Sequence, residues 1–212
     1  MMPELYATVD LSENNGFQDW LPIDWPLLLR SNPTVGGQPL YGVRTRAALG
    51  ALRPDYAWAT NWQALRASDK FQGAYQYCLP DTAPTIIAHA KNHARFLWGL
   101  IEAQGGAHAD DFPPALDIEV ANGLTPTQLT QWAETAWDEL RILSGTQPRV
   151  YSDVWFLETY LKPLIGQVPL WVAAIQPQAP ALPHVEWQWG WTRLPGIQTK
   201  VDADWYTGPL PG

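Results

Sequence analysis

Short apolar runs alternate with longer amphipathic stretches along most of the chain. The apolar runs predict strands at Tyr6–Val9, Tyr41–Thr45, Gly73–Cys78, Ala115–Glu119 and Arg149–Ser152. A stretch with helical character follows each strand, after a loop rich in turn-forming residues. Because strands that alternate with helices usually pair in parallel, this pattern predicts an α/β fold.

Two of the predicted helices have start and stop signals. The first is capped by Asp81 and ends at Gly105. The second begins with Thr125 and Gln128 at capping-box spacing and ends at Gly145. Each has one apolar face, formed by Ile86, Ala90, Ala94, Leu97 and Ile101 in the first helix and by Leu129, Trp132, Ala133, Ala136, Trp137 and Leu140 in the second.

Toward the end of the chain, strands follow one another without helices between them. Shorter helices are predicted from Asp24, over Asp55–Ser68 and over Asp153–Leu161, but the strand-like runs at 169–175, 185–191 and 199–206 are separated by loops too broken for helices. Five strand-helix units followed by three strands predict a single, irregular TIM-like barrel over residues 1–208. Residues 209–212 are predicted to be a tail or the stub of a linker.

The composition narrows the class of ligand. A net charge of -8 and the lack of a basic run argue against nucleic acid. We expect no signal peptide, because the N-terminal "MMPELYATVD" has no basic region followed by an apolar one. We expect no membrane partner, because no apolar run reaches membrane-spanning length. Thirteen Trp and eight Tyr exceed what a core needs, and such flat rings favour a carbohydrate ligand. The single cysteine, Cys78, is expected to be a thiol in the core.

Acidic residues occur on three of the predicted strands or directly after them. Asp10 follows the first strand, Asp117 and Glu119 lie on the fourth, and Asp202 and Asp204 lie on the last. Barrel enzymes carry their chemistry at the C-terminal ends of the strands, so we expect these side chains to meet there. Carboxyls that share a buried site raise one another's pKa, and one of them then keeps its proton near neutral pH. A protonated acid beside ionised carboxylates is what glycosidic bond cleavage requires.

Six segments, in order along nearly the whole chain, resemble motifs of the glycoside hydrolase family 25 muramidases, the lysozymes common among phage endolysins. They are "VDLSENNG", "GAYQYC", "PALDIE", "RVYSD", "LWVAAI" and "EWQWGWTRLPGIQTKVDADWY". The first resembles the family's D-x-S-x-x-x-G opening and the third its P-x-L-D-x-E strand. The resemblance implies a barrel of five helical units followed by three strands, which agrees with the pattern above.

The resemblance implies hydrolysis of the β-1,4 bond between N-acetylmuramic acid and N-acetylglucosamine in peptidoglycan. We expect a monomer that uses no cofactor and no metal. The resemblance also implies Glu119 as general acid and Asp10, Asp117 and Asp202 as companions that orient it and stabilise positive charge. It leaves open whether Asp117 or the substrate's own N-acetyl group attacks. The candidates for substrate binding are Tyr75, Tyr77, Tyr151, Trp171, Trp187, Gln188 and Asp204.

Three positions depart from the family's motifs. Gln76 stands where the family often has His, Asp204 where it often has Asn, and Ile175 where an aromatic residue is common. These departures affect the expected sugar contacts and pH optimum but leave the four acids intact. Because peptidoglycan lies outside the plasma membrane and no export signal is evident, we expect a phage-type lysin, released with the host's lysis machinery or carried on a virion.

The acids also have structural interpretations. Asp10 could cap a turn, and Asp202 could be an ordinary loop acid. The acid pair on the fourth strand could form ion pairs with Arg44 or Arg46, since ion-pair networks perturb carboxyls as active sites do.

Other sites and functions are weighed in the same way. His89 and His93 have metal-ligand spacing, but no third ligand is evident, and we expect a solvated face there. A chitinase would carry D-x-x-D-x-D-x-E, and this chain has Ala115 and Phe112 in place of two of its acids. The alternatives that remain are a glycosidase of a related barrel family acting on another amino-sugar polymer, and a catalytically inactive wall-binding lectin.

Overall fold

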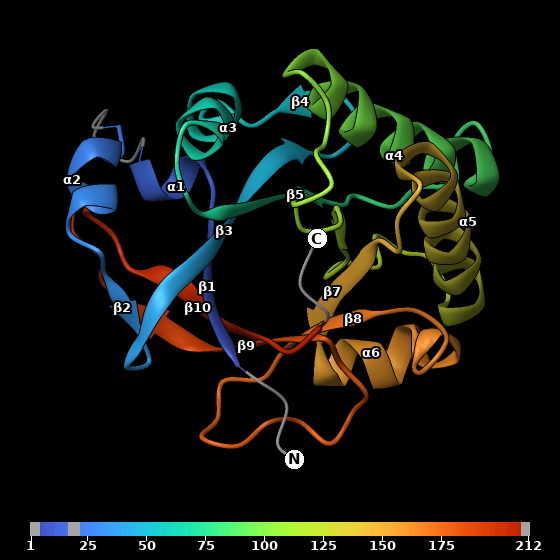
Figure 1. Ribbon diagram of the computed structural model, residues 1–212. Helices are drawn as coiled ribbons and strands as arrows, with labels where there is room; N and C mark the ends of the chain where they lie inside the picture. Colours follow the sequence, from blue (N-terminus) through green and yellow to red (C-terminus); the bar gives the residue numbers. More distant parts are fainter. Residues whose placement is uncertain (1–4, 17–21, 209–212) are drawn as a thin grey trace.

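A closed ring of strands forms the centre of the molecule (Figure 1). The computed structural model describes residues 5–16 and 22–208, and within them eight strands close the ring. In order around it they are β1 (Tyr6–Leu11), β3 (Gln38–Leu49), β5 (Phe71–Tyr77), β6 (Ala115–Asp117), β7 (Arg149–Asp153), β8 (Leu170–Ala173), β9 (Glu186–Thr192) and β10 (Val201–Tyr206). Two short strands, β2 (Thr34–Val35) and β4 (Arg53–Pro54), pair with β3. The predicted α/β barrel is confirmed, and the predicted tail at 209–212 lies outside the described residues.

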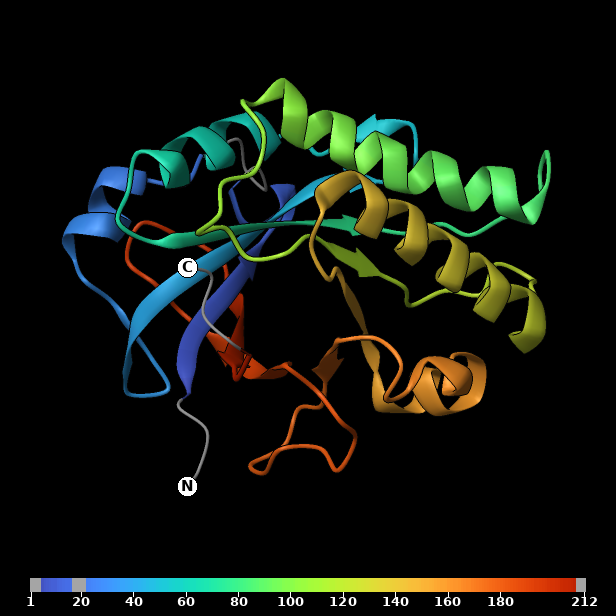
Figure 2. The same cartoon turned by 45° about the vertical axis from the view of Figure 1, so that its right-hand side comes forward.

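The helices lie outside the ring (Figure 1), and the two long ones run side by side (Figure 2). They are α1 (Glu13–Gly16), α2 (Trp25–Arg30), α3 (Trp58–Arg66), α4 (Ile86–Ala103), α5 (Pro126–Ser144), α6 (Val154–Tyr160) and the 3-10 turn η2 (Lys162–Leu164). The predicted capping box of Thr125 and Gln128 forms at the start of α5, and Gly145 ends that helix with a φ of 66°. Only a residue that tolerates the left-handed region fits there, which is why glycine marks the stop.

The start of α4 differs from the prediction. Its N-cap is Thr85, whose hydroxyl accepts a hydrogen bond from Ala88 N at 3.1 Å, whereas Asp81 accepts from backbone N–H groups in the preceding loop. Pro84 lies between Asp81 and Thr85, and a residue before proline is disfavoured in the helical region. The helix therefore begins after Pro84, too late for Asp81 to cap it.

The direction of the last strand also corrects the sequence analysis. The neighbours from β1 through β3, β5, β6, β7, β8 and β9 are parallel, but β10 is antiparallel to both β9 and β1. The segment between Thr192 and Val201 is too short for the crossover that a parallel pair needs. As a result, the beginning of β10, not its end, lies beside the C-terminal ends of the other strands.

Apolar packing lies mainly between the ring and its helices. One buried cluster joins the strands to α3, α4, α5 and α6, and it includes Trp132 and Cys78, as predicted for both. A second cluster lies on the side of α2, around β1, β3 and β10. The interior of the ring is more polar, because Arg44, Glu186 and Asp204 point into it and are fully buried. Charged groups inside a barrel are costly unless they are paired or functional.

The prediction of a solvated face at His89 and His93 is wrong. His93 is 1% exposed and His89 is half-buried, because this face of α4 packs against α5. Trp132 Nε1 donates a hydrogen bond to His89 Nδ1 at 3.0 Å. Burial lowers the pKa of His93 to about 3, so its ring is a neutral core group.

Candidate active site

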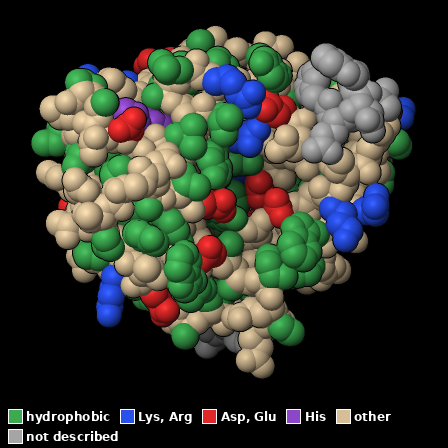
Figure 3. Space-filling model, turned by 180° about the vertical axis from the view of Figure 1, so that it is seen from behind, with side chains coloured by type: hydrophobic (Ala, Val, Ile, Leu, Met, Phe, Trp, Pro, Cys, Tyr) green, Lys and Arg blue, Asp and Glu red, His purple; other side chains and the backbone are tan. Residues whose placement is uncertain are grey.

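A cavity of about 220 Å³ lies at the C-terminal end of the barrel, on the face that Figure 3 shows. Its lining residues are Asp10, Ser12, Asn14, Asn15, Arg46, Tyr75, Asp117, Glu119, Tyr151, Trp171 and Asp202. Figure 3 shows acidic side chains gathered in the central hollow of this face, among hydrophobic ones. All four predicted acids therefore line one cavity, although they come from β1, the β6 end and β10.

Local backbone geometry directs the acid pair of the fourth ring strand into the cavity. Strand β6 ends at Asp117, two residues earlier than predicted, so Glu119 lies beyond it. The ladder nevertheless continues for one residue, because Ile118 N donates to the Tyr151 carbonyl oxygen at 2.9 Å. Ile118 is fully buried on the outer side of the ring, and alternation then places Asp117 and Glu119 together on the inner side.

Asp202 and Asp10 form one facing pair of carboxyls. They lie directly opposite each other in the antiparallel register of β1 and β10. Burial raises the pKa of Asp10 well above its usual value, and the charge of Asp202 raises it further, while a hydrogen bond from the Tyr75 hydroxyl at 3.1 Å opposes both. Loss of solvent also raises the pKa of Asp202, against the effect of Gln188 and Trp191. The pair therefore resists full ionisation.

Asp117 and Glu119 differ in their access to solvent. Asp117 is 6% exposed, and burial raises its pKa well above the usual value, with Glu119 and Asp10 adding to the shift. The Glu119 side chain is exposed in the cleft mouth, and the surrounding walls still raise its pKa by partial desolvation, opposed by the Tyr151 hydroxyl. The arrangement can thus hold a proton on a carboxyl that faces the cavity.

The nearby arginines are committed to other acids. Arg44 pairs with the buried Glu186, at 2.7 Å between Nη2 and Oε2. Arg46 lines the cavity but its Nε lies 2.8 Å from Asp55 Oδ2. The ion-pair interpretation of the acids on the fourth ring strand is therefore wrong, because the two arginines have different partners.

The residues predicted to bind substrate fall into two groups. Tyr75, Tyr151 and Trp171 line the cavity, but each is at most 9% exposed. Their polar atoms donate to other side chains: Tyr75 to Asp10, Tyr151 to Gln188 and Trp171 to Asp204. These three support the floor of the cavity more than they offer a flat ring to a ligand.

The other four predicted residues are not among those that line the cavity. Gln188 and Asp204 lie one layer deeper in the ring, and burial raises the pKa of Asp204 well above its usual value. Trp187 is 7% exposed and donates to the Ala174 carbonyl oxygen at 2.7 Å. Tyr77 is half-buried at the end of β5. The burial of Trp187, Gln188 and Asp204 argues for support of the site. Burial raises the pKa of Tyr77 and the charges of Glu119 and Asp117 add to the shift, so its hydroxyl lies near the acid pair.

The structure adds residues that the sequence analysis did not single out. Ser12, Asn14 and Asn15 reach the cavity from the end of β1 and the first turn of α1. Asn15 Oδ1 accepts from Ser12 N at 2.7 Å, which holds this turn against the strand end. The signal was present in "SENN", which begins two residues after Asp10 within the motif "VDLSENNG". Trp191 is also exposed on this side of β9.

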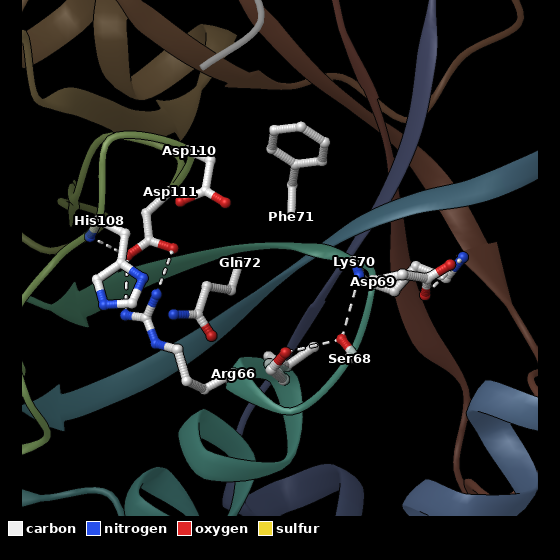
Figure 4. Close-up of a pocket in the computed structure, with 10 residues that line it drawn as sticks. Arg66, Ser68, Asp69, Lys70, Phe71, Gln72, His108, Asp110 and Asp111 are labelled. Atoms are coloured by element: carbon white, nitrogen blue, oxygen red, sulfur yellow. Dashed lines mark hydrogen bonds and ion pairs between the residues drawn. The ribbon is translucent and has the colours of Figure 1, made fainter. Parts of the chain in front are cut away.

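A second cavity of about 220 Å³ lies at the opposite end of the barrel, where β5 and β6 begin (Figure 4). Figure 4 shows Arg66 and Asp111 pointing toward each other, and their Nη2 and Oδ2 atoms are 3.0 Å apart. The other acids that line it, Asp69 and Asp110, are solvent-exposed. Its acids are thus paired or solvated, unlike the crowded carboxyls of the first cavity.

Two further properties bear on the kind of site. Within residues 5–16 and 22–208, no group of three or more His, Cys, Asp or Glu is arranged to hold a metal ion. No helix in the same part of the chain is long and apolar enough to cross a membrane.

Asp117→Asn is expected to gain stability relative to the wild type as the pH rises. An unfolded Asp has a pKa of about 3.9, and the folded-state pKa of Asp117 lies well above its usual value. Between these two values the folded wild type binds more protons than the unfolded chain, so its stability falls as the pH rises through this window. Asn does not titrate and escapes this loss.

Urea denaturation at a series of pH values from 4 to 8 measures this difference in the free energy of unfolding. Asp138→Asn, on the exposed side of α5, controls for the general loss of a negative charge. Titration of the histidines affects wild type and variant alike and cancels. A difference that stays level or shrinks with rising pH, relative to that control, would show that Asp117 is not held in its neutral form.

Comparisons with known proteins agree with this geometry. The sequence pattern of the family described as Glycosyl hydrolases family 25 matches residues 9–195. The structure is similar to a bacterial lysozyme from Streptomyces coelicolor (TM-score 0.75, 20% identity, 97% of this chain and 93% of that chain). It is also similar to a muramidase from Trichobolus zukalii (TM-score 0.74, 19% identity, 97% and 95%) and to a family 25 glycosyl hydrolase from Bacillus anthracis (TM-score 0.76, 17% identity, 98% and 90%). No curated protein sequence matches the chain.

Proposed function

Because the chain belongs to glycosyl hydrolase family 25, we propose that its acidic cleft hydrolyses the β-1,4 bond between N-acetylmuramic acid and N-acetylglucosamine in peptidoglycan. The observation that carries the proposal is the meeting of Asp10, Asp117, Glu119 and Asp202 in one cavity at the C-terminal end of the barrel. Structures of the same fold include a lysozyme and a muramidase, which supports a glycan of the cell wall as substrate.

Glu119 is the proton donor in this proposal. Its side chain is exposed in the cleft, so its carboxyl can contact the oxygen of a bound glycosidic bond. Its pKa is raised, which favours the protonated form that a general acid needs. As the bond between the anomeric carbon and this oxygen breaks, the proton passes from Glu119 to the oxygen of the leaving sugar.

The other three acids act on the positive charge that develops at the anomeric carbon. Asp117 lies below Glu119, and Asp10 and Asp202 face each other across the β1 and β10 pair. Burial and mutual repulsion keep part of this group protonated, so the three acids are not all ionised at once. The negative charge that they do carry is confined to a partly desolvated cavity, where it stabilises an adjacent positive centre more strongly than it would in water. Water then completes hydrolysis and returns a proton to Glu119.

Digestion of purified peptidoglycan tests the proposal directly. The products are reduced with borohydride and analysed by mass spectrometry, and we expect reduced muramic acid at the new ends. Reduced glucosamine ends would show a different glycosidase specificity. Binding to the wall without any cleavage would show an inactive lectin, and either result would overturn the proposal.

The same proposal places the site of action at the bacterial wall, outside the plasma membrane. We propose a phage-type lysin, either released during host lysis or carried on the virion. Phage genes around the native reading frame would support this role, and an upstream signal peptide in that frame would contradict it.

A further inference from the structure

A bulge in β9 changes which side of the ring its side chains face. Opposite β10, Gln188 pairs with Asp204, and the next pair is Gly190 with Ala203, so Trp189 is an extra residue on β9. In a regular strand, residues three apart such as Gln188 and Trp191 point to opposite sides. Because Trp189 is an extra residue between them, the side chains of Gln188 and Trp191 point to the same side of the sheet.

Trp191 consequently faces the cavity. It lies directly opposite Asp202 in the register, and cross-strand partners project from the same side of a sheet. Asp202 lines the acidic cavity, so the Trp191 indole lies at its edge. Its N–H is close enough to the Asp202 carboxylate to lower the pKa of that group.

The two tryptophans of this strand segment have different environments. Trp189 stacks on Trp205 outside the ring, with 5.8 Å between ring centroids and 18° between planes. Trp191 is 56% exposed. A large, rigid and exposed ring beside a functional carboxyl is what ligand sites use for contact, whereas Tyr75, Tyr151 and Trp171 are buried in the floor.

We propose that Trp191 is a positioning residue that stacks on a pyranose ring of the glycan bound on the Asp202 side of the cleft. The inference rests on the proposed function and adds a contact that determines how the glycan is held. The apolar face of the sugar packs on the indole, and the indole N–H orients the Asp202 carboxylate. The bulge at Trp189 makes both possible, because without it Trp191 would point outward.

Steady-state kinetics on solubilised peptidoglycan glycan strands test the proposal. Trp191→Ala is expected to raise KM by about 10-fold, with kcat within roughly 3-fold, because loss of one aromatic anchor at a binding site typically costs about a factor of ten. Trp191→Phe keeps a ring but removes the N–H donor. It is expected to keep KM near the wild-type value and to shift the acid limb of the pH profile upward, since Asp202 then loses a group that lowers its pKa.

Ile142→Ala is the control for the loss of a large exposed apolar side chain. Ile142 is 69% exposed in the last turn of α5, which leads into the start of β7 at the opposite end of the barrel from the cavity, so KM should stay within about 2-fold of wild type. Unchanged KM in Trp191→Ala, or an equal change in both variants, would overturn the inference.

A binding measurement separates this inference from the proposed function. In a Glu119→Gln background, Trp191→Ala is expected to weaken retention on insoluble peptidoglycan by about 10-fold, the factor expected for KM. Equal retention with and without Trp191 overturns the stacking role, whatever the cleavage assay shows. If the wild type releases no muramic acid ends, the proposed function fails, and retention on chitin-type N-acetylglucosamine polymer then tests Trp191 as a sugar contact by itself.

Discussion

Glu119→Gln is expected to slow peptidoglycan cleavage by at least about 100-fold, because positioned acid catalysis contributes roughly 100- to 10,000-fold. Gln keeps the shape and the hydrogen-bonding capacity of Glu but has no transferable proton at working pH. Glu119 is exposed in the cavity whereas Asp117 is 6% exposed below it, so Glu119 is the better placed of the two to contact a glycosidic oxygen. The initial rate of release of reducing ends from purified peptidoglycan measures the loss.

The same substitution should not destabilise the fold. Burial raises the pKa of Asp117 and the charge of Glu119 raises it further, so neutral Gln at position 119 removes a repulsion, and the melting temperature should be unchanged or higher. Glu134→Gln, on the exposed side of α5, is the matched control and should keep full activity. A folded Glu119→Gln protein that cleaves at nearly the wild-type rate would remove Glu119 from the mechanism. One that fails to fold would make the acid structural.

The activities of Asp10→Asn and Asp202→Asn can be compared with that of Glu119→Gln. Asp10→Asn and Asp202→Asn should lose less activity than Glu119→Gln if these carboxyls mainly stabilise charge, because the remaining acids still surround the anomeric centre. If either variant loses more activity than Glu119→Gln, the replaced aspartate and not Glu119 makes the larger contribution to catalysis.

Arg44→Met is expected to lower the free energy of unfolding by about 3–5 kcal/mol, the usual cost of leaving one member of a buried ion pair alone. Arg44 and Glu186 are both fully buried. The Arg44 Nε lies 3.0 and 2.9 Å from the two carboxylate oxygens, and Nη1 donates to the Pro113 carbonyl oxygen at 3.0 Å. Nη2 is also close to the carboxylate, at 2.7 Å, although not aligned as a hydrogen bond. Removing the guanidinium leaves the Glu186 charge inside the ring without its cation.

Urea denaturation measures this change, and Arg95→Met is the matched control. Arg95 is 58% exposed and pairs with Glu139 on the surface, where an ion pair contributes at most about 1 kcal/mol. The double variant Arg44→Met with Glu186→Leu should recover much of the loss, because no unpaired charge remains. Equal effects of Arg44→Met and Arg95→Met, or a double variant less stable than the single one, would contradict the assigned role of the pair.

The pattern along the chain was enough to predict the strand-helix order, the barrel and the meeting of the acids at the C-terminal ends of its strands. Local signals that involve few residues worked well, such as the capping box at Thr125 and the stop at Gly145. The stretch "LDIE" was informative for the same reason: alternation within a strand is a local property, and it placed Asp117 and Glu119 on one side. The predicted cap at Asp81 was wrong because Pro84 disfavours the helical region for the residue before it, so α4 begins after Pro84 with Thr85 as its N-cap.

Only the tertiary structure decided which groups meet. Asp202 reaches the cavity because β10 runs antiparallel, and Trp191 faces it because of the bulge at Trp189; neither feature has a distinct signature in the residues themselves. His93 became a core group because α4 packs against α5.

The tertiary structure also decided which charged residues form ion pairs. The sequence could propose Arg44 as a partner for the acids of the fourth ring strand, but Arg44 pairs with Glu186, far along the chain. Secondary structure and side-chain alternation follow from neighbouring residues, so the sequence by itself determined them. The pairing of charges, the access of a carboxyl to solvent and the face presented by an aromatic ring depend on distant strands brought together, and closure of the barrel decided them.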